Sequence, residues 1–108
     1  MAIVSKNLQA MYLLYYRSFH VVEVTEDYEI PATDFTVICN SPNNIVLTLP
    51  EGTLGQAVFN LKNIGTGIVS VRGKDITLDT IDDESTQELY EGDCMNVRKT
   101  DAHKWSII

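Results

Sequence analysis

Residues 44–50 read Asn44-Ile45-Val46-Leu47-Thr48-Leu49-Pro50, and this short stretch indicates the fold of the chain. In an extended chain successive side chains point to opposite faces, so Ile45, Leu47 and Leu49 would share one face. Pro50 then ends the run, because proline has no amide hydrogen to donate to a sheet. The stretch therefore predicts a β-strand with one buried side.

Runs of the same kind recur along most of the chain. They are short and rich in β-branched residues, and several alternate in the same way. The runs are Val21–Thr25, Phe35–Cys39, Ile45–Leu49, Ala57–Leu61, Ile68–Val71, Ile76–Leu78, Gln87–Tyr90, Met95–Arg98 and Trp105–Ile108. Turn-forming residues separate them at intervals of roughly 8 to 12 residues, which is typical of an antiparallel sandwich or barrel. We therefore expect residues 21–108 to form a mainly β head domain, an antiparallel β-sandwich or barrel resembling a jelly roll.

The length of the chain bounds the number of domains. At 108 residues it can bury one hydrophobic core but not two. Hydrophobic residues make up 44% and charged residues 21%, as in ordinary globular domains, so the chain should fold. No internal repeat of fixed period is evident. We expect one domain preceded by a short arm.

The arm is residues 1–20, which differ in character from the rest. No glycine or proline occurs before residue 31, and five apolar side chains recur at the spacing of one helical face. These are Leu8, Met11, Tyr12, Tyr15 and Phe19. An isolated helix of this length is marginal in water, so it must pack against its own domain or against other copies. We expect a helical arm for attachment or oligomerisation with these five residues at the interface, although the β-forming residues between Tyr12 and Val24 leave a strand as the alternative.

The charge is negative and unevenly distributed. The formal net charge is -7, and the stretch from Gly73 to Asp93 holds eight acidic residues against Lys74 alone. Binding to a phosphate backbone requires clustered lysine and arginine, whereas the eight basic residues here are scattered. This pattern argues against nucleic acid and against an anionic membrane as partners.

Cysteine usage and hydropathy indicate a cytosolic product. Cys39 and Cys94 are too few for a disulfide framework and too far apart for a Cys-x-x-Cys motif, so we expect reduced thiols packed in the core. The uncharged run near the N-terminus, Asn7–Tyr16, is far shorter than the roughly 20 residues of a membrane span. No cleavage site of a signal peptide is apparent, so we expect neither secretion nor membrane insertion.

The chain shows no catalytic motif. His20 and His103 lie in different segments without metal-ligand spacing, and no nucleophile elbow or phosphate-binding glycine loop occurs. We therefore expect no enzyme activity, no catalytic residue and no cofactor.

The acidic segment from Asp75 to Asp93 leaves a calcium site as an alternative, since calcium takes six to eight oxygen ligands from irregular loops. The best candidates for its ligands are Asp79, Asp82, Asp83 and Glu84. The paired carboxylates of a glycosidase are another interpretation of the same cluster, but they need a cleft that a chain of this size seldom builds. A carboxylate run is more often a solvated loop that discourages aggregation beside strand edges, and this is the interpretation we favour.

Six segments, taken in order, resemble small β modules of tailed-phage appendage proteins of the tail-fibre, head-fibre and receptor-binding type. They are Glu23–Ile30, Asp34–Cys39, Asn44–Pro50, Gly55–Gly67, Ile76–Asp82 and Lys104–Ile108. Within them, Asn63 to Gly67 suggests a hairpin, and Trp105 is expected to close the core with the last strand. The chain departs from the family pattern at Ile81-Asp82-Asp83, where the family often has Ile-Asp-Gly, and at Ala102-His103-Lys104, in place of Gly-Thr-Asn. Those two turns are therefore expected to be built differently.

The resemblance implies a structural component of a phage virion, assembled in the host cytoplasm. It implies a homotrimer whose N-terminal segment attaches or trimerises and whose β head contacts other virion proteins or a host-surface glycan. It implies no catalysis.

Two further classes of function remain open. A carbohydrate-binding module would stack exposed aromatic residues on sugar rings, although we expect Trp105 to be buried. A small trimeric hydrolase would need a metal-containing pocket between subunits.

Overall fold

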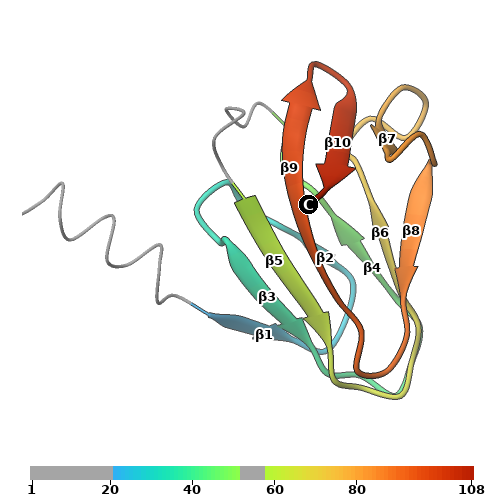
Figure 1. The fold of residues 1–108 in the computed structure, drawn as a ribbon. Helices are drawn as coiled ribbons and strands as arrows, with labels where there is room; N and C mark the ends of the chain where they lie inside the picture. The colour runs from blue at the N-terminus through green and yellow to red at the C-terminus, as the bar shows by residue number, and fades with distance from the viewer. Residues whose placement is uncertain (1–20, 52–57) are drawn as a thin grey trace, which may run out of the picture.

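The structure is a computed structural model that describes residues 21–51 and 58–108 (Figure 1). This part of the chain contains ten strands and no helix, so the prediction of a mainly β domain is confirmed. The strands are β1 (Val22–Val24), β2 (Tyr28–Glu29), β3 (Thr36–Cys39), β4 (Ile45–Thr48), β5 (Val58–Asn63), β6 (Val69–Arg72), β7 (Thr80–Ile81), β8 (Thr86–Leu89), β9 (Cys94–Asp101) and β10 (Lys104–Ile107). The predicted helical arm, residues 1–20, lies outside the described residues. No helix that could cross a membrane is found in the part that is described.

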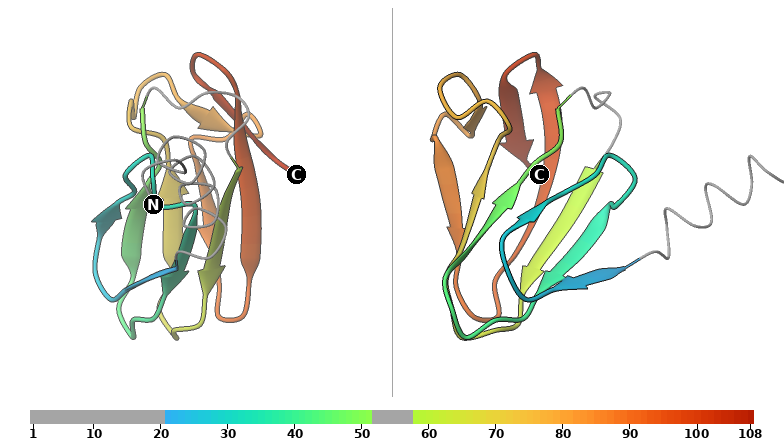
Figure 2. Two further views of the ribbon diagram at one scale, coloured as in Figure 1. Left: turned by 90° about the vertical axis from the view of Figure 1, so that its left-hand side faces the viewer. Right: turned by 180° about the vertical axis from the view of Figure 1, so that it is seen from behind.

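The strands form two sheets that face each other (Figures 1 and 2). Sheet A has the strand order β1-β3-β5-β9-β10-β7, and sheet B has the order β2-β4-β6-β8. From β1 to β9 each strand lies in the sheet opposite to the strand before it. Among β1 to β6, neighbours within a sheet come from successive circuits of the chain and run in the same direction.

The prediction of an antiparallel, jelly-roll-like arrangement is therefore wrong. The pairs β1–β3, β3–β5, β2–β4, β4–β6 and β7–β10 are parallel, whereas β5–β9, β6–β8 and β9–β10 are antiparallel. The physical reason is that most turns carry the chain across to the other sheet instead of reversing it within one sheet. Both sheets are consequently mixed.

The register of the strands contains a repeat that the sequence analysis missed. Thr36 pairs with Asn60 in sheet A and Ile45 pairs with Val69 in sheet B, and both partners lie 24 residues further along the chain. The β3–β4 and β5–β6 circuits therefore stack in one register in both sheets, as successive turns of a solenoid do. The first circuit is shorter, since Val22 pairs with Val37 only 15 residues later.

The corners between the sheets stack as closely as the strands. They lie side by side at the lower end of the domain in Figure 1. The amide of Gly67 donates to the carbonyl of Ser41 at 2.9 Å, and the amide of Ile68 donates to Oδ1 of Asn44, also at 2.9 Å. A Cβ atom on Gly65 would overlap the backbone of Ser41, and one on Gly67 would overlap the backbone carbonyl of Asn43.

These contacts correct the prediction of a hairpin at Asn63 to Gly67. The strands on either side, β5 and β6, belong to different sheets, so the segment is a corner and not a hairpin. Its glycines are not among the described residues with positive φ, which are Asp82, Asp83 and Gly92. Glycine is required at these corners because one backbone passes directly against another.

Strands β8 and β9 end the stack by reversing direction. β8 and β9 run antiparallel to β6 and β5, and the turn between them is held by Asn63. The Asn63 side chain is fully buried, donates to the carbonyls of Gly67 and Leu89, and accepts from the amide of Gly65. The Asn63 side-chain amide thus joins the corner between β5 and β6 to the end of β8. The hydrogen-bonding capacity of this amide is largely satisfied.

The core lies between the two sheets and contains sixteen buried hydrophobic side chains from the described residues. Ile45, Leu47 and Leu49 are all buried, as the alternating pattern predicts. Trp105 on β10 is 1% exposed and packs against Phe59, with 5.8 Å between ring centroids. The prediction that Trp105 closes the core with the last strand is confirmed.

One expected strand, Ile76–Leu78, is instead a turn, so that prediction is wrong. Oδ1 of Asp75 accepts hydrogen bonds from the amides of Thr77 and Leu78, at 3.0 and 3.3 Å. Local bonds of this kind compete with strand pairing, because the amides they occupy cannot join a sheet. Ile76 and Leu78 are left 63% and 57% exposed.

The close corners predict which glycines the fold cannot replace. Gly65→Ala or Gly67→Ala should lower the free energy of unfolding by about 3 kcal/mol or more, because two backbone segments would have to separate. Gly92→Ala is the control: its φ is 88° but no atom lies within 4 Å of the added carbon, so we expect a cost of about 1 kcal/mol. Urea unfolding of the three variants measures the difference, and equal costs would contradict the stacked-corner account.

Candidate functional site

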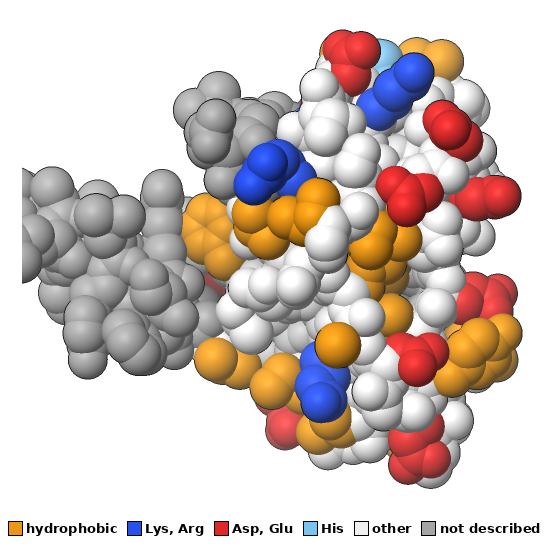
Figure 3. All heavy atoms as spheres, viewed as in Figure 1, with side chains coloured by type: hydrophobic (Ala, Val, Ile, Leu, Met, Phe, Trp, Pro, Cys, Tyr) orange, Lys and Arg blue, Asp and Glu red, His pale blue; other side chains and the backbone are white. Residues whose placement is uncertain are grey.

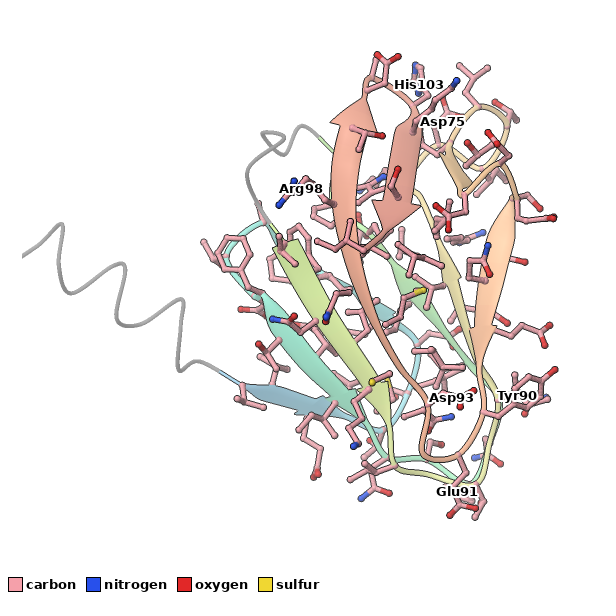
Figure 4. All side chains as sticks on the ribbon, viewed as in Figure 1. Asp75, Tyr90, Glu91, Asp93, Arg98 and His103 are labelled. Atoms are coloured by element: carbon pink, nitrogen blue, oxygen red, sulfur yellow. The ribbon has the colours of Figure 1, made fainter. Side chains whose placement is uncertain are left out.

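The most elaborate polar cluster of the described residues lies at the end of the domain opposite the corners, where Asp75 and His103 are labelled in Figure 4. The loop between β6 and β7 meets the turn between β9 and β10 there. Nδ1 of His103 lies 2.8 Å from Oδ1 of Asp79, and the other carboxylate oxygen of Asp79 accepts from the amide of Asp75 at 3.0 Å. The Asp79 side chain is 7% exposed, whereas that of His103 is 49% exposed. Asp79 therefore ties two loops together from beneath the surface.

Asp75 orders the same loop from its exposed side. Its Oδ1 accepts from the hydroxyl of Thr77 at 2.7 Å as well as from the amides of Thr77 and Leu78. The hydroxyl and amide hydrogen bonds of Thr77 are the main causes that lower the pKa of Asp75 below its ordinary value of 3.8, and His103 contributes less. The carboxylate form is therefore the one that fits the folded loop.

A buried carboxylate that orients an imidazole is also an element of catalytic triads, in which the imidazole is hydrogen-bonded to a nucleophilic hydroxyl or thiol as well. Among residues 21–51 and 58–108, the side chain hydrogen-bonded to the His103 ring is that of Asp79, and no hydroxyl or thiol group is bonded to this ring. A carboxylate and an imidazole without a nucleophile can orient a loop or bind a proton. The geometry supports a structural clasp.

The four calcium-ligand candidates do not converge. Asp79 is occupied by His103 and the Asp75 amide, and Oδ1 of Asp82 accepts from the amide of Ile107 at 3.1 Å. Asp82 and Asp83 have φ values of 50° and 66°, the left-handed region that aspartate tolerates better than most residues. The turn therefore holds aspartate at both of these positions. Within the described part of the chain, no three His, Cys, Asp or Glu side chains could hold a metal ion.

The two cysteines have opposite surroundings. Cys39 is buried in the core, and burial raises the pKa of its thiol to about 11. Cys94 is exposed at the start of β9, so the prediction that both pack in the core is wrong for Cys94. The alternating pattern explains the error, because Met95 takes the inward position beside it.

A second polar cluster surrounds Tyr90 at the corner between β8 and β9, where Figure 4 shows Tyr90, Glu91 and Asp93 together. The phenol of Tyr90 donates to Glu88 at 2.7 Å, and the amide of Tyr90 donates to Asp93 at 2.9 Å. Tyr90 is 53% exposed. Of the aromatic residues that the structure describes, only Tyr90 is exposed, so a sugar-stacking platform could use this ring but not the buried Trp105.

A shallow hollow of about 310 Å³ lies where the first two circuits meet. It is lined by Thr25, Glu26, Asp27, Asn43, Asn44 and Ile45. Asp27 accepts from the amide of Val46 at 2.8 Å, and Asn44 accepts from that of Ile68, so two of the polar side chains are already used to hold the corners. The hollow has no aromatic wall and no cation.

The residues predicted for an oligomer interface, Leu8, Met11, Tyr12, Tyr15 and Phe19, lie outside the described residues, as does His20. The sequence analysis missed the Asp79–His103 pair, whose members are 24 residues apart and form no motif. It also missed the role of Asn63, because a buried asparagine leaves no signal in a hydrophobic pattern.

No protein-family model, curated protein or solved structure matches the chain.

Removing the charge of Asp79 should loosen the clasp. The variant Asp79→Asn keeps the size of the side chain but places an amide where two donors need acceptors, so we expect a loss of about 1 to 3 kcal/mol in unfolding free energy. Hydrogen exchange of the Asp75 amide should become faster than in the native chain. Asp83→Asn, at an exposed position, is the control and should change neither quantity.

The lowered pKa of Asp75 predicts a dependence of stability on pH. The unfolded chain binds a proton at this carboxyl more readily than the folded chain, so its contribution is present above pH 3.8 and is lost as the pH falls through the lower folded pKa. The melting temperature of Asp75→Asn should therefore lie below that of the native chain near neutral pH, and the two should converge in strong acid. A difference that stays constant with pH would contradict the role of the charge.

Proposed function

We propose that the chain is a structural protein of a phage particle, a fibre, adhesion or decoration module that acts by assembly and binding. The observation that carries the proposal is that the described residues already supply a core of sixteen hydrophobic side chains, while a further apolar stripe precedes them at residues 8–19. Because the core is already filled, a stripe of this kind would expose apolar surface to water unless it packs against another surface. Other copies of the chain can provide that surface.

The point at which the arm joins the domain supports this proposal. The described chain begins at Val21, directly before β1, and β1 is the edge strand of sheet A. Attachment at a sheet edge does not require an arm to cross either sheet face. The domain can then be held by its arm and present its surfaces to other virion proteins or to a host.

The use of the polar groups also supports a role without catalysis. The clasp at Asp79, the corner amide of Asn63 and the turn carboxylate of Asp75 each make hydrogen bonds that hold loops in place. These aspartate, histidine and asparagine side chains, of types that also occur in catalytic sites, thus stabilise the fold of the described part. The resemblance of six ordered segments to phage appendage modules supplies the biological setting.

Light scattering of the purified full chain tests the assembly. We expect a mass of three chains at micromolar concentration, because the predicted stripe on each arm would be shared among copies. A stable monomer would contradict the proposal.

Variants of the arm test which residues hold the copies together. Tyr12→Glu with Tyr15→Glu places two charges on the predicted stripe and should dissociate the trimer. Ala10→Glu with Arg17→Gln changes the net charge by the same amount on the opposite side of the predicted helix and should leave the trimer intact. If both pairs of substitutions act alike, or neither acts, the arm is not the interface.

A labelled antibody on intact particles tests the setting. We expect binding to a fixed position on the head or tail of a phage that encodes this chain. Binding to a glycan panel that is lost on Tyr90→Ala, with no label on particles, would favour the carbohydrate-binding alternative.

A further inference from the structure

The central outer face of sheet A differs in charge from the rest of the domain. Alternation along β3, β5 and β9 places eight side chains on this face, because their neighbours in sequence are the buried ones. They are Thr36, Ile38, Val58, Asn60, Lys62, Cys94, Asn96 and Arg98. The set contains two cations and no carboxylate, in a chain whose net charge is -7, and the adjacent edge strand β1 places one exposed carboxylate, Glu23, beside Ile38. We refer to these eight residues as the central face.

The residues of the central face are aligned by the register. Lys62 lies opposite Cys94, Asn60 opposite Asn96, and Val58 opposite Arg98. Nε of Arg98 is shielded from solvent and has no hydrogen-bond partner among the described residues. The terminal N–H groups of the guanidinium, and not the shielded Nε, are the donors that a carboxylate brought to this face can reach.

The acidic residues gather elsewhere, along β7, β8 and the turn into β9. In Figure 3 red side chains follow the right-hand margin of the molecule, while blue ones lie on the face toward the viewer. We call this margin the acidic ridge, and it consists of the exposed residues Asp82, Asp83, Glu84, Glu88, Glu91 and Asp93. No basic residue occurs between Asp82 and Asp93, and the exposed ring of Tyr90 protrudes among them.

We propose that the central face of one copy receives the acidic ridge of the next copy. Within one copy the guanidinium of Arg98 and the labelled residues Tyr90, Glu91 and Asp93 lie on opposite sides of β9, so one chain does not make this contact with itself (Figure 4). The two surfaces are different patches of the same molecule, and contacts of this heterologous type form a ring when the rotation from one copy to the next closes on itself. This inference rests on the proposed function, because a trimer is such a ring.

The size of the central face limits its role. Three strands about 4.8 Å apart and roughly 17 Å long cover roughly 200 to 300 Å². A stable interface buries about 800 Å² on each partner, so the central face cannot hold the trimer by itself. The arm supplies the affinity, and the charged contact sets how the β heads are oriented around the ring.

Cys94 provides a probe of this contact, because it lies on the central face and is exposed within a single copy. The full-length trimer is treated with iodoacetamide, a neutral reagent, and the alkylation of each cysteine is followed by mass spectrometry. We expect Cys94 to react about tenfold more slowly in the trimer than in the same protein at high salt, where screening weakens the contact. Cys39, buried with a raised pKa, is the internal control and should remain unmodified while the fold is intact.

Charge reversal tests the identity of the two surfaces. Lys62→Glu with Arg98→Glu should expose Cys94, and adding Glu84→Lys with Glu91→Lys to the same chain should restore its protection. The matched control is Arg72→Glu with Lys74→Glu, which changes the charge equally; Arg72 lies on sheet B and Lys74 pairs with Glu29 on that sheet. If the reversed variants do not fold, Lys62→Gln with Arg98→Gln serves in their place.

Each result supports or overturns the contact. Protection of Cys94 that is lost on reversal and restored by the swap supports it. A trimer in which Cys94 reacts equally fast with and without Lys62 and Arg98, or in which the sheet B control has the same effect, overturns the contact and leaves the trimer standing. A monomeric chain overturns both this contact and the proposed function.

Discussion

The close passage of backbone over backbone at Gly65 and Gly67 is the constraint on which the rest of the structure depends. Because no side chain separates these residues from Ser41 and Asn43, the corner between β5 and β6 lies directly on the corner between β3 and β4. Corners that stack without an offset fix the register on both sides at once, and both sheets accordingly show the same 24-residue step. A core built from two sheets requires this agreement, since a one-residue slip in either sheet would turn its hydrophobic side outward.

The stack ends where Asn63 replaces the apolar residue expected at an inward position. Its counterpart in the preceding circuit is Cys39, which is buried and presents an apolar-like thiol at the same position. Asn63 instead donates to Gly67 and to Leu89, the last residue of β8. After three parallel circuits the chain returns antiparallel at this amide, and the reversal gives β9 its place between β5 and β10.

The sequence predicted which residues face the core better than it predicted how the chain connects them. Ile45, Leu47, Leu49 and Trp105 were all found buried, because alternation depends on backbone geometry alone. The direction of each turn was not predictable, since Ser41–Asn44 marks where a strand ends but not which sheet comes next. The repeat was hidden for a similar reason: only its apolar positions recur, and the Asp79–His103 pair depends on contacts that no local pattern encodes.

Many polar side chains of the loops and the apolar side chains of the core hold the fold together, so contacts with a partner depend on the outer surface of the sheets. In the described part, Asn63, Asp79 and Asp75 hold loops in place, and the inner face of each sheet is apolar. The charged side chains of the outer surface are sorted by the topology, with Lys62 and Arg98 on β5 and β9 and exposed carboxylates along β7, β8 and the turn after β8. In the trimer that we propose, a surface divided in this way would distinguish one orientation of a neighbouring copy from another.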